Sequence, residues 1–467
     1  MPFSEEDVQR MIEQAVAIAV APLLARIAEL EAQLAQNSRN SSKPPSSDGL
    51  KKPPAKPRNT QSLRKPSGKS SGGQRGHPGT TLKPTDTPDH LQTHLPPACC
   101  DACQSTLPDA TLAQTRQVFD LPPVTLEVTE HQVFATRCTC GKVHRGVFPP
   151  EVNHPVQYGP GILALAVHLT HHHMMPLKRT CDLLNDLYGS RLSQATILAA
   201  RDRVGVKLKE TMGPQICQGL LASEVLHADE TGMRAGGKLH WVHVAATEAL
   251  TWLKAHTKRG AEAMNEIGLL PAYQGMCVHD CLPGYFGFGF TDVICNAHLV
   301  RELVCCHEVH HQPWAKQLKN LMWTALAEVK QTGQPLHPPR LSRYQNRYDK
   351  LLAKGEALNP EPPKTGKRGR MKRTKAGNLL IRLRKHRDAI WRFSTVWGVP
   401  FTNNTAEQAV RMPKVKQKIA GCFRTRDGLD KFCLIRSCLS TMIKQQINPL
   451  QGITDTLSGK QITLKLA

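Results

Sequence analysis

The sequence contains no apolar run that could cross a lipid bilayer. The longest, Ala15–Ala25, has 11 residues, whereas a membrane-spanning helix needs about 20. The preceding residues Ser4–Asp7 are mostly acidic, and a secretory signal peptide carries basic residues there. We therefore expect a cytoplasmic protein whose 15 cysteines are reduced thiols except where they bind a metal.

Acidic residues are scarce, and two long segments almost lack them. The chain has 61 Lys and Arg against 38 Asp and Glu, a formal net charge of +23. Arg39–Arg75 contains ten basic residues and one acid, and Lys364–Arg387 contains 11 basic residues and no acid. Neither segment has a Trp or Phe to anchor it in a membrane, so nucleic acid is the expected partner. The phosphate contacts predicted in these segments are Lys51, Lys52, Lys56, Arg58, Arg64, Lys65, Arg75, Lys367, Arg368, Arg370, Lys372 and Arg373.

Residues 1–36 are predicted to form a leucine-zipper-like helix. Six apolar residues recur at alternating spacings of four and three, which is typical of a coiled-coil seam. Pro22 either breaks this helix or begins its second half. A coiled coil that pairs two chains and an amphipathic helix that packs on its own domain both fit, and the first predicts a homodimer or higher oligomer. The six residues are Val16, Val20, Leu23, Ile27, Leu30 and Leu34.

Residues 37–96 are rich in Ser, Pro, Gly, Lys and Arg. Such a segment has too few apolar side chains to form a core. It is therefore interpreted as a flexible basic arm that binds DNA, with a plain tether as the alternative.

Residues 97–150 are predicted to form a small zinc-binding domain. Cys100 and Cys103 make one pair, and Cys138 and Cys140 make a second, slightly tighter pair. Structural Zn²⁺ prefers four tetrahedral ligands, which two such pairs can supply. Cys99 and His144 are alternative ligands, and alternating residues predict strands at Val124–Val128 and His131–Ala135.

Residues 158–222 are predicted to be a helical segment that binds DNA or connects domains. Apolar residues recur at helical spacing, and Ser193 is placed to cap a helix. His168 and the run His171–His173 suggest a metal site. Adjacent side chains point in different directions around a helix, so packed or solvent-facing histidines are the favoured interpretation.

Residues 223–427 are predicted to form an α/β domain. Its expected order is three strands, a helix, a strand, a helix and a fifth strand. This order is typical of a ribonuclease-H-like sheet, in which the first and fourth strands are neighbours. A helical insertion is expected at about 308–400, and a helical segment at 428–467. The strands are predicted at Val225–Asp229, Lys238–Ala245, Ala249–Ala255, Gly275–Asp280 and Val293–Cys295, with helices at Arg259 to about Leu269 and Asn296 to about His307.

Three acidic residues of this domain are the candidate catalytic site. Asp229 and Asp280 end the first and fourth strands, and Glu407 lies in the first turn of a basic helix. Three carboxylates that meet can bind two Mg²⁺ or Mn²⁺ ions, which prefer oxygen ligands and cut or join phosphodiesters. Glu230 and Asp292 are rival ligands. Predicted phosphate contacts near Glu407 are Arg411, Lys414, Lys416, Lys418, Arg424 and Arg426.

The chain resembles transposases of the insertion-sequence-66 family, which carry an Asp-Asp-Glu triad. The resemblance spans nearly the whole chain and is carried by the two cysteine pairs and by NSSKPPSSD at 40–48, GGQRGHPG at 72–79, HADETGMRAGGKLHWVHVA at 227–245, KRGAEAM at 258–264, VHDCLPGYF at 278–286, CNAHLVREL at 295–303 and NNTAEQAVRMPKVKQKIAGCFRT at 403–425. It implies a leucine zipper, a zinc-binding domain and a ribonuclease-H-like core with the triad Asp229, Asp280 and Glu407. Cys295 and His298 are similar to a Cys-x2-His pair of related transposases, with packing and metal binding both open.

The function predicted from this resemblance is DNA transposition. The enzyme would bind the terminal inverted repeats of its element, cleave 3′ ends with Mg²⁺ and join them to target DNA, with accessory proteins of the same element as further partners. Two alternatives are an inactive DNA-binding regulator and a ribonuclease-H-like nuclease without strand transfer.

Overall fold

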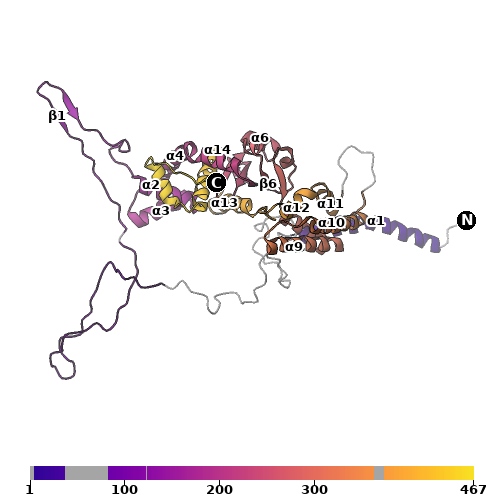
Figure 1. The fold of residues 1–467 in the computed structure, drawn as a ribbon, viewed down its shortest axis with the longest axis horizontal. Helices are drawn as coiled ribbons and strands as arrows, with labels where there is room; N and C mark the ends of the chain where they lie inside the picture. Colours follow the sequence, from indigo (N-terminus) through magenta and orange to yellow (C-terminus); the bar gives the residue numbers. More distant parts are fainter. Residues whose placement is uncertain (1–4, 37–81, 123, 362–372, 467) are drawn as a thin grey trace. The chain divides into compact units, whose positions relative to one another are not determined.

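The computed structural model describes residues 5–36, 82–122, 124–361 and 373–466 (Figure 1). The chain divides into two units, Met1–Lys51 with Val128–Ala467, and Lys52–Glu127. Among the described residues, no helix is both long and apolar enough to span a membrane. The predicted phosphate contacts that lie outside the described residues are Lys51, Lys52, Lys56, Arg58, Arg64, Lys65, Arg75, Lys367, Arg368, Arg370 and Lys372.

Helix α1 (Glu5–Leu34) continues through Pro22 without a break. All six apolar residues of the predicted seam are exposed in the single chain, among them Leu23 at 63% and Ile27 at 51%. The part of the chain that the structure describes therefore does not bury these six side chains.

The segment after residue 128 begins with a short antiparallel hairpin of β1 (Ala135–Arg137) and β2 (Val143–Arg145). Its tight turn uses Gly141 at φ 90°, a left-handed conformation that glycine adopts easily. The strand expected at Val124–Val128 was wrong, and the one expected at His131–Ala135 starts only at Ala135. Alternating residues form a strand only where another strand pairs with them, and here the partner covers residues 135–137 alone.

Four helices follow as expected: α2 (Pro160–His171), α3 (Leu177–Tyr188), α4 (Gln194–Glu210) and α5 (Met212–Ala222). The predicted cap is confirmed, because the Ser193 hydroxyl accepts a hydrogen bond from the Thr196 amide at 3.0 Å. These helices share one core with the sheet and with the C-terminal helices, including Leu208, Ile216 and Leu439.

A five-stranded sheet forms the centre of the molecule, in the order β5-β4-β3-β6-β7. The first three strands in sequence are an antiparallel meander, whose first turn uses Gly236 and Gly237 at positive φ. Strand β6 then pairs with β3 in parallel, and β7 pairs with β6 in parallel. The first strand in sequence thus lies beside the fourth, as expected. The strands are β3 (Val225–Ala235), β4 (Lys238–Ala246), β5 (Thr251–His256), β6 (Met276–His279) and β7 (Thr291–Ile294).

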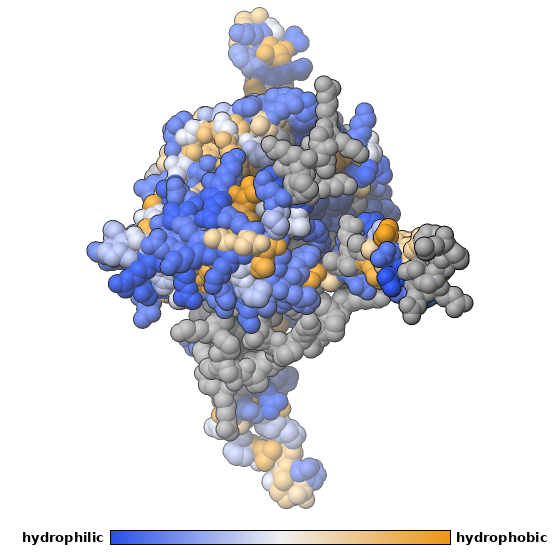
Figure 2. Space-filling view, turned by 90° about the vertical axis from the view of Figure 1, so that its right-hand side faces the viewer, coloured by the Kyte–Doolittle hydropathy of each residue, from blue (hydrophilic) through white to orange (hydrophobic). Residues whose placement is uncertain are grey.

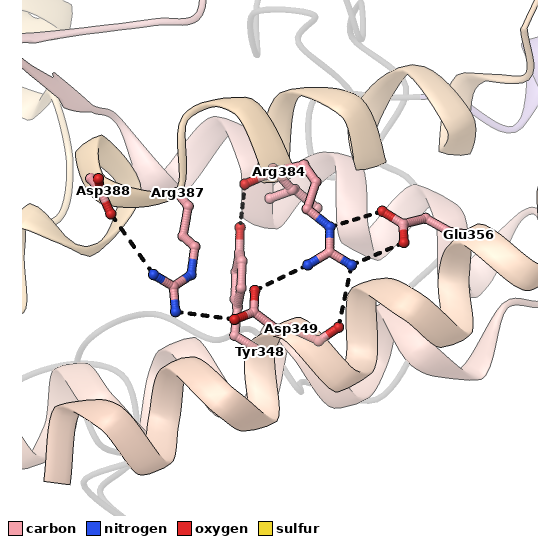
Figure 3. A network of polar contacts seen from close by, with 7 residues as sticks. Tyr348, Asp349, Glu356, Arg384, Arg387 and Asp388 are labelled. Carbon is pink, nitrogen blue, oxygen red and sulfur yellow. Dashed lines mark hydrogen bonds and ion pairs between the residues drawn. The ribbon is translucent and has the colours of Figure 1, made fainter. Parts of the chain in front are cut away.

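The predicted helical insertion consists of α9 (Pro313–Thr332), α10 (Pro338–Leu358), α11 (Lys375–Lys385) and α12 (Arg387–Thr395). It packs with α8 (Asn296–Glu308) around a core that includes Trp314, Tyr348 and Trp391. Arg384 and Arg387 join α10 to the next two helices through Asp349, at 3.1 Å each, and Arg384 also binds Glu356 (Figure 3). These two arginines of the second basic segment are therefore paired within the protein.

Helix α14 (Arg426–Lys444) covers the edge strand β5. The Ser437 hydroxyl accepts a hydrogen bond from the Leu253 amide at 2.8 Å, and the Thr441 hydroxyl accepts one from the Thr251 amide at 3.0 Å. Unpaired edge amides are thereby satisfied, which blocks pairing with another strand. The remaining helices are α6 (Ala261–Ile267), α7 (Leu269–Ala272), α13 (Asn404–Ala420) and α15 (Pro449–Leu457).

One face of the molecule is mostly hydrophilic, with hydrophobic side chains in small separate patches (Figure 2). Scattered apolar side chains of this kind are ordinary on protein surfaces. This face therefore gives no indication of a large apolar docking surface.

Candidate functional site

Asp229 and Asp280 are placed side by side by the register of two parallel strands. The β3–β6 ladder ends with the pair His227 and Val278. Asp229 and Asp280 each lie two residues beyond that pair, at the same level along the two strands. Strand β3 continues past Asp229 to Ala235 to pair with β4, so Asp229 lies within the strand rather than at its end.

Glu407 reaches the same place because Asn403 attaches the start of α13 to β3. The Asn403 side chain donates a hydrogen bond to the Ala228 carbonyl at 2.7 Å, and its amide oxygen lies 2.9 Å from Nδ1 of His227. Asn403 is only 1% exposed. It is bonded to the residue that precedes Asp229, so it positions the first turn of α13, where Glu407 lies, beside that carboxylate.

Asp229 is affected by its burial and by the charges of the other two carboxylates. Burial is the main cause that raises the pKa of Asp229 to about 8, and the negative charges of Glu230, Asp280 and Glu407 contribute to that increase. Clustered carboxylates of this kind repel one another unless a cation neutralises them. Mg²⁺ and Mn²⁺ prefer oxygen ligands, and the three carboxylates supply them. Asp229 keeps a proton at a place where a divalent cation would relieve the repulsion, so the site fits either ion.

Glu407 has a second set of neighbours on α8 and at its start. Its Oε1 lies 3.9 Å from Sγ of Cys295, 3.8 Å from Nδ1 of His298 and 3.7 Å from the Arg301 guanidinium. The ligand atoms of Cys295, His298 and Glu407 all lie within 4.8 Å of one another, so this trio could also hold a metal ion. Cys295 is fully buried, and burial raises its pKa to about 12, which keeps the thiol protonated. Arg301 adds a positive charge at the same carboxylate.

The rival ligands Glu230 and Asp292 already have partners inside the protein. The Glu230 carboxylate accepts hydrogen bonds from Arg259 at 2.8 Å and from the Tyr285 hydroxyl at 2.6 Å. Asp292 lies 2.9 Å from Nε2 of the fully buried His279, whose ring stacks on Tyr285 at 4.6 Å. These five residues form a polar network next to the two aspartates. Sequence reasoning missed the network, although the motif containing Asp280 also contains His279 and Tyr285.

The predicted phosphate contacts near Glu407 divide into exposed and engaged residues. Arg411, Lys418 and Arg424 are exposed. The other three, Lys414, Lys416 and Arg426, are partly buried or bound by groups of the protein itself. Arg373 is also bound within the protein, by Glu361 at 2.7 Å. The Lys414 amine contacts the Gly232 carbonyl, burial lowers the pKa of Lys416, and Arg426 pairs with Asp430 at 2.8 Å and contacts the Ala255 carbonyl.

The two cysteine pairs fall in different units, with Cys100 and Cys103 in Lys52–Glu127 and Cys138 and Cys140 in the other. Each pair lies on a tight turn, closed by the Gln104 amide on the Cys100 carbonyl at 3.0 Å and by the Gly141 amide on the Cys138 carbonyl at 2.8 Å. A hydrogen bond from Ser105 lowers the pKa of Cys103, and hydrogen bonds from Cys140 lower that of Cys138. A lowered pKa favours the thiolate, the form that binds zinc.

The raised pKa of Asp229 predicts a pH-dependent cost to stability in metal-free protein. Its pKa is about 8 in the folded state and about 4 in the unfolded chain. The folded state therefore holds the extra proton between these values, and stability decreases as the pH rises from about 4 to 8. We expect Asp229→Asn to raise the stability at pH 8 by roughly 1–3 kcal/mol, and to change it little at pH 4.

Thermal unfolding in EDTA at pH 4, 6 and 8 measures this difference. Glu248→Gln, at an exposed acid in the turn before β5, is the matched control and should show no such pH trend. A destabilised Asp229→Asn protein at pH 8 would contradict the raised pKa of Asp229 in the folded state.

Comparison with protein families gives three matches. Residues 155–431 match the family described as "Transposase IS66 family", and residues 97–141 match the "zinc-finger binding domain of transposase IS66". Residues 3–83 match a family of unknown function. A comparison with curated proteins finds no match. The first match contains all three clustered carboxylates, and the second contains both cysteine pairs.

Proposed function

Because the chain belongs to the IS66 family of transposases, we propose that it cleaves the 3′ ends of its insertion sequence and joins them to target DNA. The observation that carries this proposal is geometric: the β3–β6 register places Asp229 and Asp280 side by side, and Asn403 attaches the start of α13, which carries Glu407, to β3. We assign these three residues as the catalytic triad. The strand order with β3 between β4 and β6 supports a ribonuclease-H-like core.

The catalytic residues would act by holding divalent metal ions and positioning DNA. Two bound Mg²⁺ or Mn²⁺ ions would activate the attacking water or 3′-hydroxyl and would stabilise the leaving oxygen. Asp229, Asp280 and Glu407 are the residues that would hold them. Asn403 keeps Glu407 beside Asp229, and Arg259 and Tyr285 bind Glu230, so that its charge does not compete for the site.

The partner of this site is double-stranded DNA, both the terminal inverted repeats and the target. The exposed Arg411, Lys418 and Arg424 lie on or just after the helix that carries Glu407, where they can contact phosphates. The basic arm and the zinc-binding domain are proposed to bind the element ends. The zinc ligands would be Cys100, Cys103, Cys138 and Cys140, which the match to a zinc-finger domain supports.

The exposed seam of α1 predicts that the protein is a homodimer or higher oligomer. Replacing Leu23 and Leu30 by Asp places two charges in the seam, and we expect the double variant to be monomeric at concentrations where the wild type is dimeric. Size-exclusion chromatography with light scattering measures the mass of each. Gln33→Asp, a charge on the same helix outside the six seam residues, is the control. A wild-type monomer at micromolar concentration would contradict the coiled coil.

The decisive experiment is a strand-transfer assay with duplexes that carry the element ends. With Mg²⁺, the proposed enzyme should both nick the 3′ ends and join them to a target plasmid. Specific binding without nicking would instead identify a DNA-binding regulator. Nicking without joining would identify a nuclease that lacks strand transfer.

A further inference from the structure

Among the described residues, Arg436 is a buried cation without an anionic partner. It lies on α14, is 6% exposed, and its Nε has no hydrogen-bond partner. Within residues 5–36, 82–122, 124–361 and 373–466, it forms no ion pair, and its one hydrogen-bonding contact is with Nδ1 of His172, at 3.3 Å. Burial lowers its pKa to about 10, so it remains charged at neutral pH.

A buried guanidinium without a carboxylate destabilises the free protein. Removing such a charge from water is costly, and only a close anion or several hydrogen bonds can offset the cost. Other cations of this protein are paired, for example Arg382 with Glu302 at 3.0 Å and Arg426 with Asp430 at 2.8 Å. Arg436 therefore lacks the partner that these arginines have.

Three histidine rings gather at the end of α2, and one of them, His172, contacts the Arg436 guanidinium. His168 and His172 stack with ring centres 4.7 Å apart, and His173 meets them edge-on at 4.9 and 4.7 Å. Nδ1 of His168 is buried and has no hydrogen-bond partner. His173 is exposed, while the other two are half-buried, so the group opens to solvent on the His173 side. The helix continues as a tight turn there, which brings together side chains that an ideal helix would separate.

The cation that acts on His168 and His172 is Arg436. Burial lowers the pKa of the neighbouring His171, and the positive charges of Lys416, Arg201 and Arg436 lower it further. Asp202, next to Arg201 on α4, is already bound by Arg201 at 2.6 Å and by Lys431 at 3.1 Å. An anion entering the group of three rings would meet the positive charge of Arg436.

We propose that Arg436 with His168, His172 and His173 forms a binding site for a DNA phosphodiester. The inference rests on the proposed function for its ligand, because DNA is the polyanion on which a transposase acts. A backbone phosphate would accept hydrogen bonds from the guanidinium, and the imidazoles would contribute donors on its open side. The site lies on α2 and α14 and uses none of the triad residues.

A metal ion is the competing occupant, because the ligand atoms of the three histidines lie within 4.8 Å of one another. Two observations oppose it. A neutral imidazole has one ring nitrogen with a free lone pair for a metal ion. In His172 that nitrogen is Nδ1, which accepts from the Arg436 guanidinium. The Arg436 guanidinium, which contacts His172, would repel a metal ion, whereas it attracts phosphate.

The first test compares the stability of two variants on the same helix. Arg436→Met removes an uncompensated charge, so the melting temperature of the DNA-free protein should stay the same or rise. Arg426→Met removes an arginine that is paired, so it should lower the melting temperature by several degrees. If Arg436→Met also lowers it by several degrees, Arg436 has a structural role and the proposal is wrong.

The second test measures diethyl pyrocarbonate modification of the three histidines by mass spectrometry at pH 7. A saturating duplex should slow modification of His172 and His173 by about tenfold in the wild type, and by less than twofold in the Arg436→Met protein. In the His172→Gln protein, modification of the remaining His173 should likewise slow by less than twofold. Inorganic phosphate at the same phosphate concentration separates a free anion from a duplex phosphate and should protect much less. Protection by Zn²⁺ with none by the duplex would overturn the proposal.

The inactive Asp229→Asn protein separates this inference from the proposed function. Protection by the duplex in that variant depends on phosphate binding alone. If the wild type fails in strand transfer while its histidines are protected by the duplex, the catalytic proposal fails and the phosphate site stands. If the wild type carries out strand transfer while the histidines of both proteins remain unprotected, the phosphate site fails and the catalytic proposal stands.

Discussion

Replacing Asp229 by Asn is expected to abolish both 3′-end nicking and strand transfer while leaving the protein folded and able to bind DNA. Asp229 lies beside Asp280, and the negative charges of Asp280 and Glu407 add to the burial that raises its pKa. Removing one charge from a site proposed to hold two metal ions would remove transition-state stabilisation at the reacting phosphate. We expect the rate to fall by roughly 10³-fold or more.

The same loss is expected for Asp280→Asn and Glu407→Gln, since each removes one carboxylate of the cluster. Rates measured under single-turnover conditions with saturating Mg²⁺ exclude an effect on DNA binding, which fluorescence anisotropy checks separately. Glu248→Gln, at an exposed acid of the β4–β5 turn, should keep the wild-type rate. If any triad variant retains more than a tenth of the wild-type rate with normal DNA binding, its assignment to the triad is wrong.

Loss of zinc is the second large effect, expected when Cys100 or Cys138 is replaced by Ser. In zinc-dependent domains the metal supplies about 10–16 kcal/mol of apparent binding free energy, and the apo form is unfolded. Removing one of four thiolates should therefore release the zinc and unfold residues 97–150. Element-end binding should weaken strongly, whereas the sheet that carries the triad has its own core and should remain folded.

Metal content by mass spectrometry and limited proteolysis measure this outcome. Zinc should fall from about one per chain to near zero in either variant, and cleavage should appear between residues 97 and 150. Cys422→Ser, at an exposed cysteine outside that segment, is the control and should keep its zinc. Full zinc in both the Cys100→Ser and Cys138→Ser proteins would remove the four-cysteine assignment, with Cys99 and His144 as the next ligands to test.

Local patterns predicted most elements of the fold correctly. Ser193 caps α4, the meander turns at Gly236 and Gly237, and the insertion is helical. Each of these depends on residues close in sequence, so the chemistry of capping, positive φ and apolar periodicity was enough. The strand expected at Val124–Val128 was wrong because strand formation depends on a partner that the local pattern does not reveal.

Site residues were harder to interpret because their roles depend on distant partners. From the sequence alone, Glu230 is a reasonable metal ligand. In the fold, Arg259 and Tyr285 bind its carboxylate, and Tyr285 lies 55 positions from Glu230 in the sequence. The sequence predicts Lys414 and Arg426 as phosphate contacts. In the fold, Lys414 contacts the Gly232 carbonyl, 182 positions away, and Arg426 contacts the Ala255 carbonyl, 171 positions away. A charged side chain in a sequence can face water, DNA or its own backbone, and only packing decides among these.

By itself, the sequence determined the family, the order of strands and helices, and the residue types of the candidate site, because motifs and periodicity are local properties of the chain. Tertiary structure decided which of those residues meet. Asn403 joins α13 to Ala228 across 175 positions, and Arg436 meets His172 across 264. Contacts over such separations form only when the whole core packs, so no local pattern encodes them.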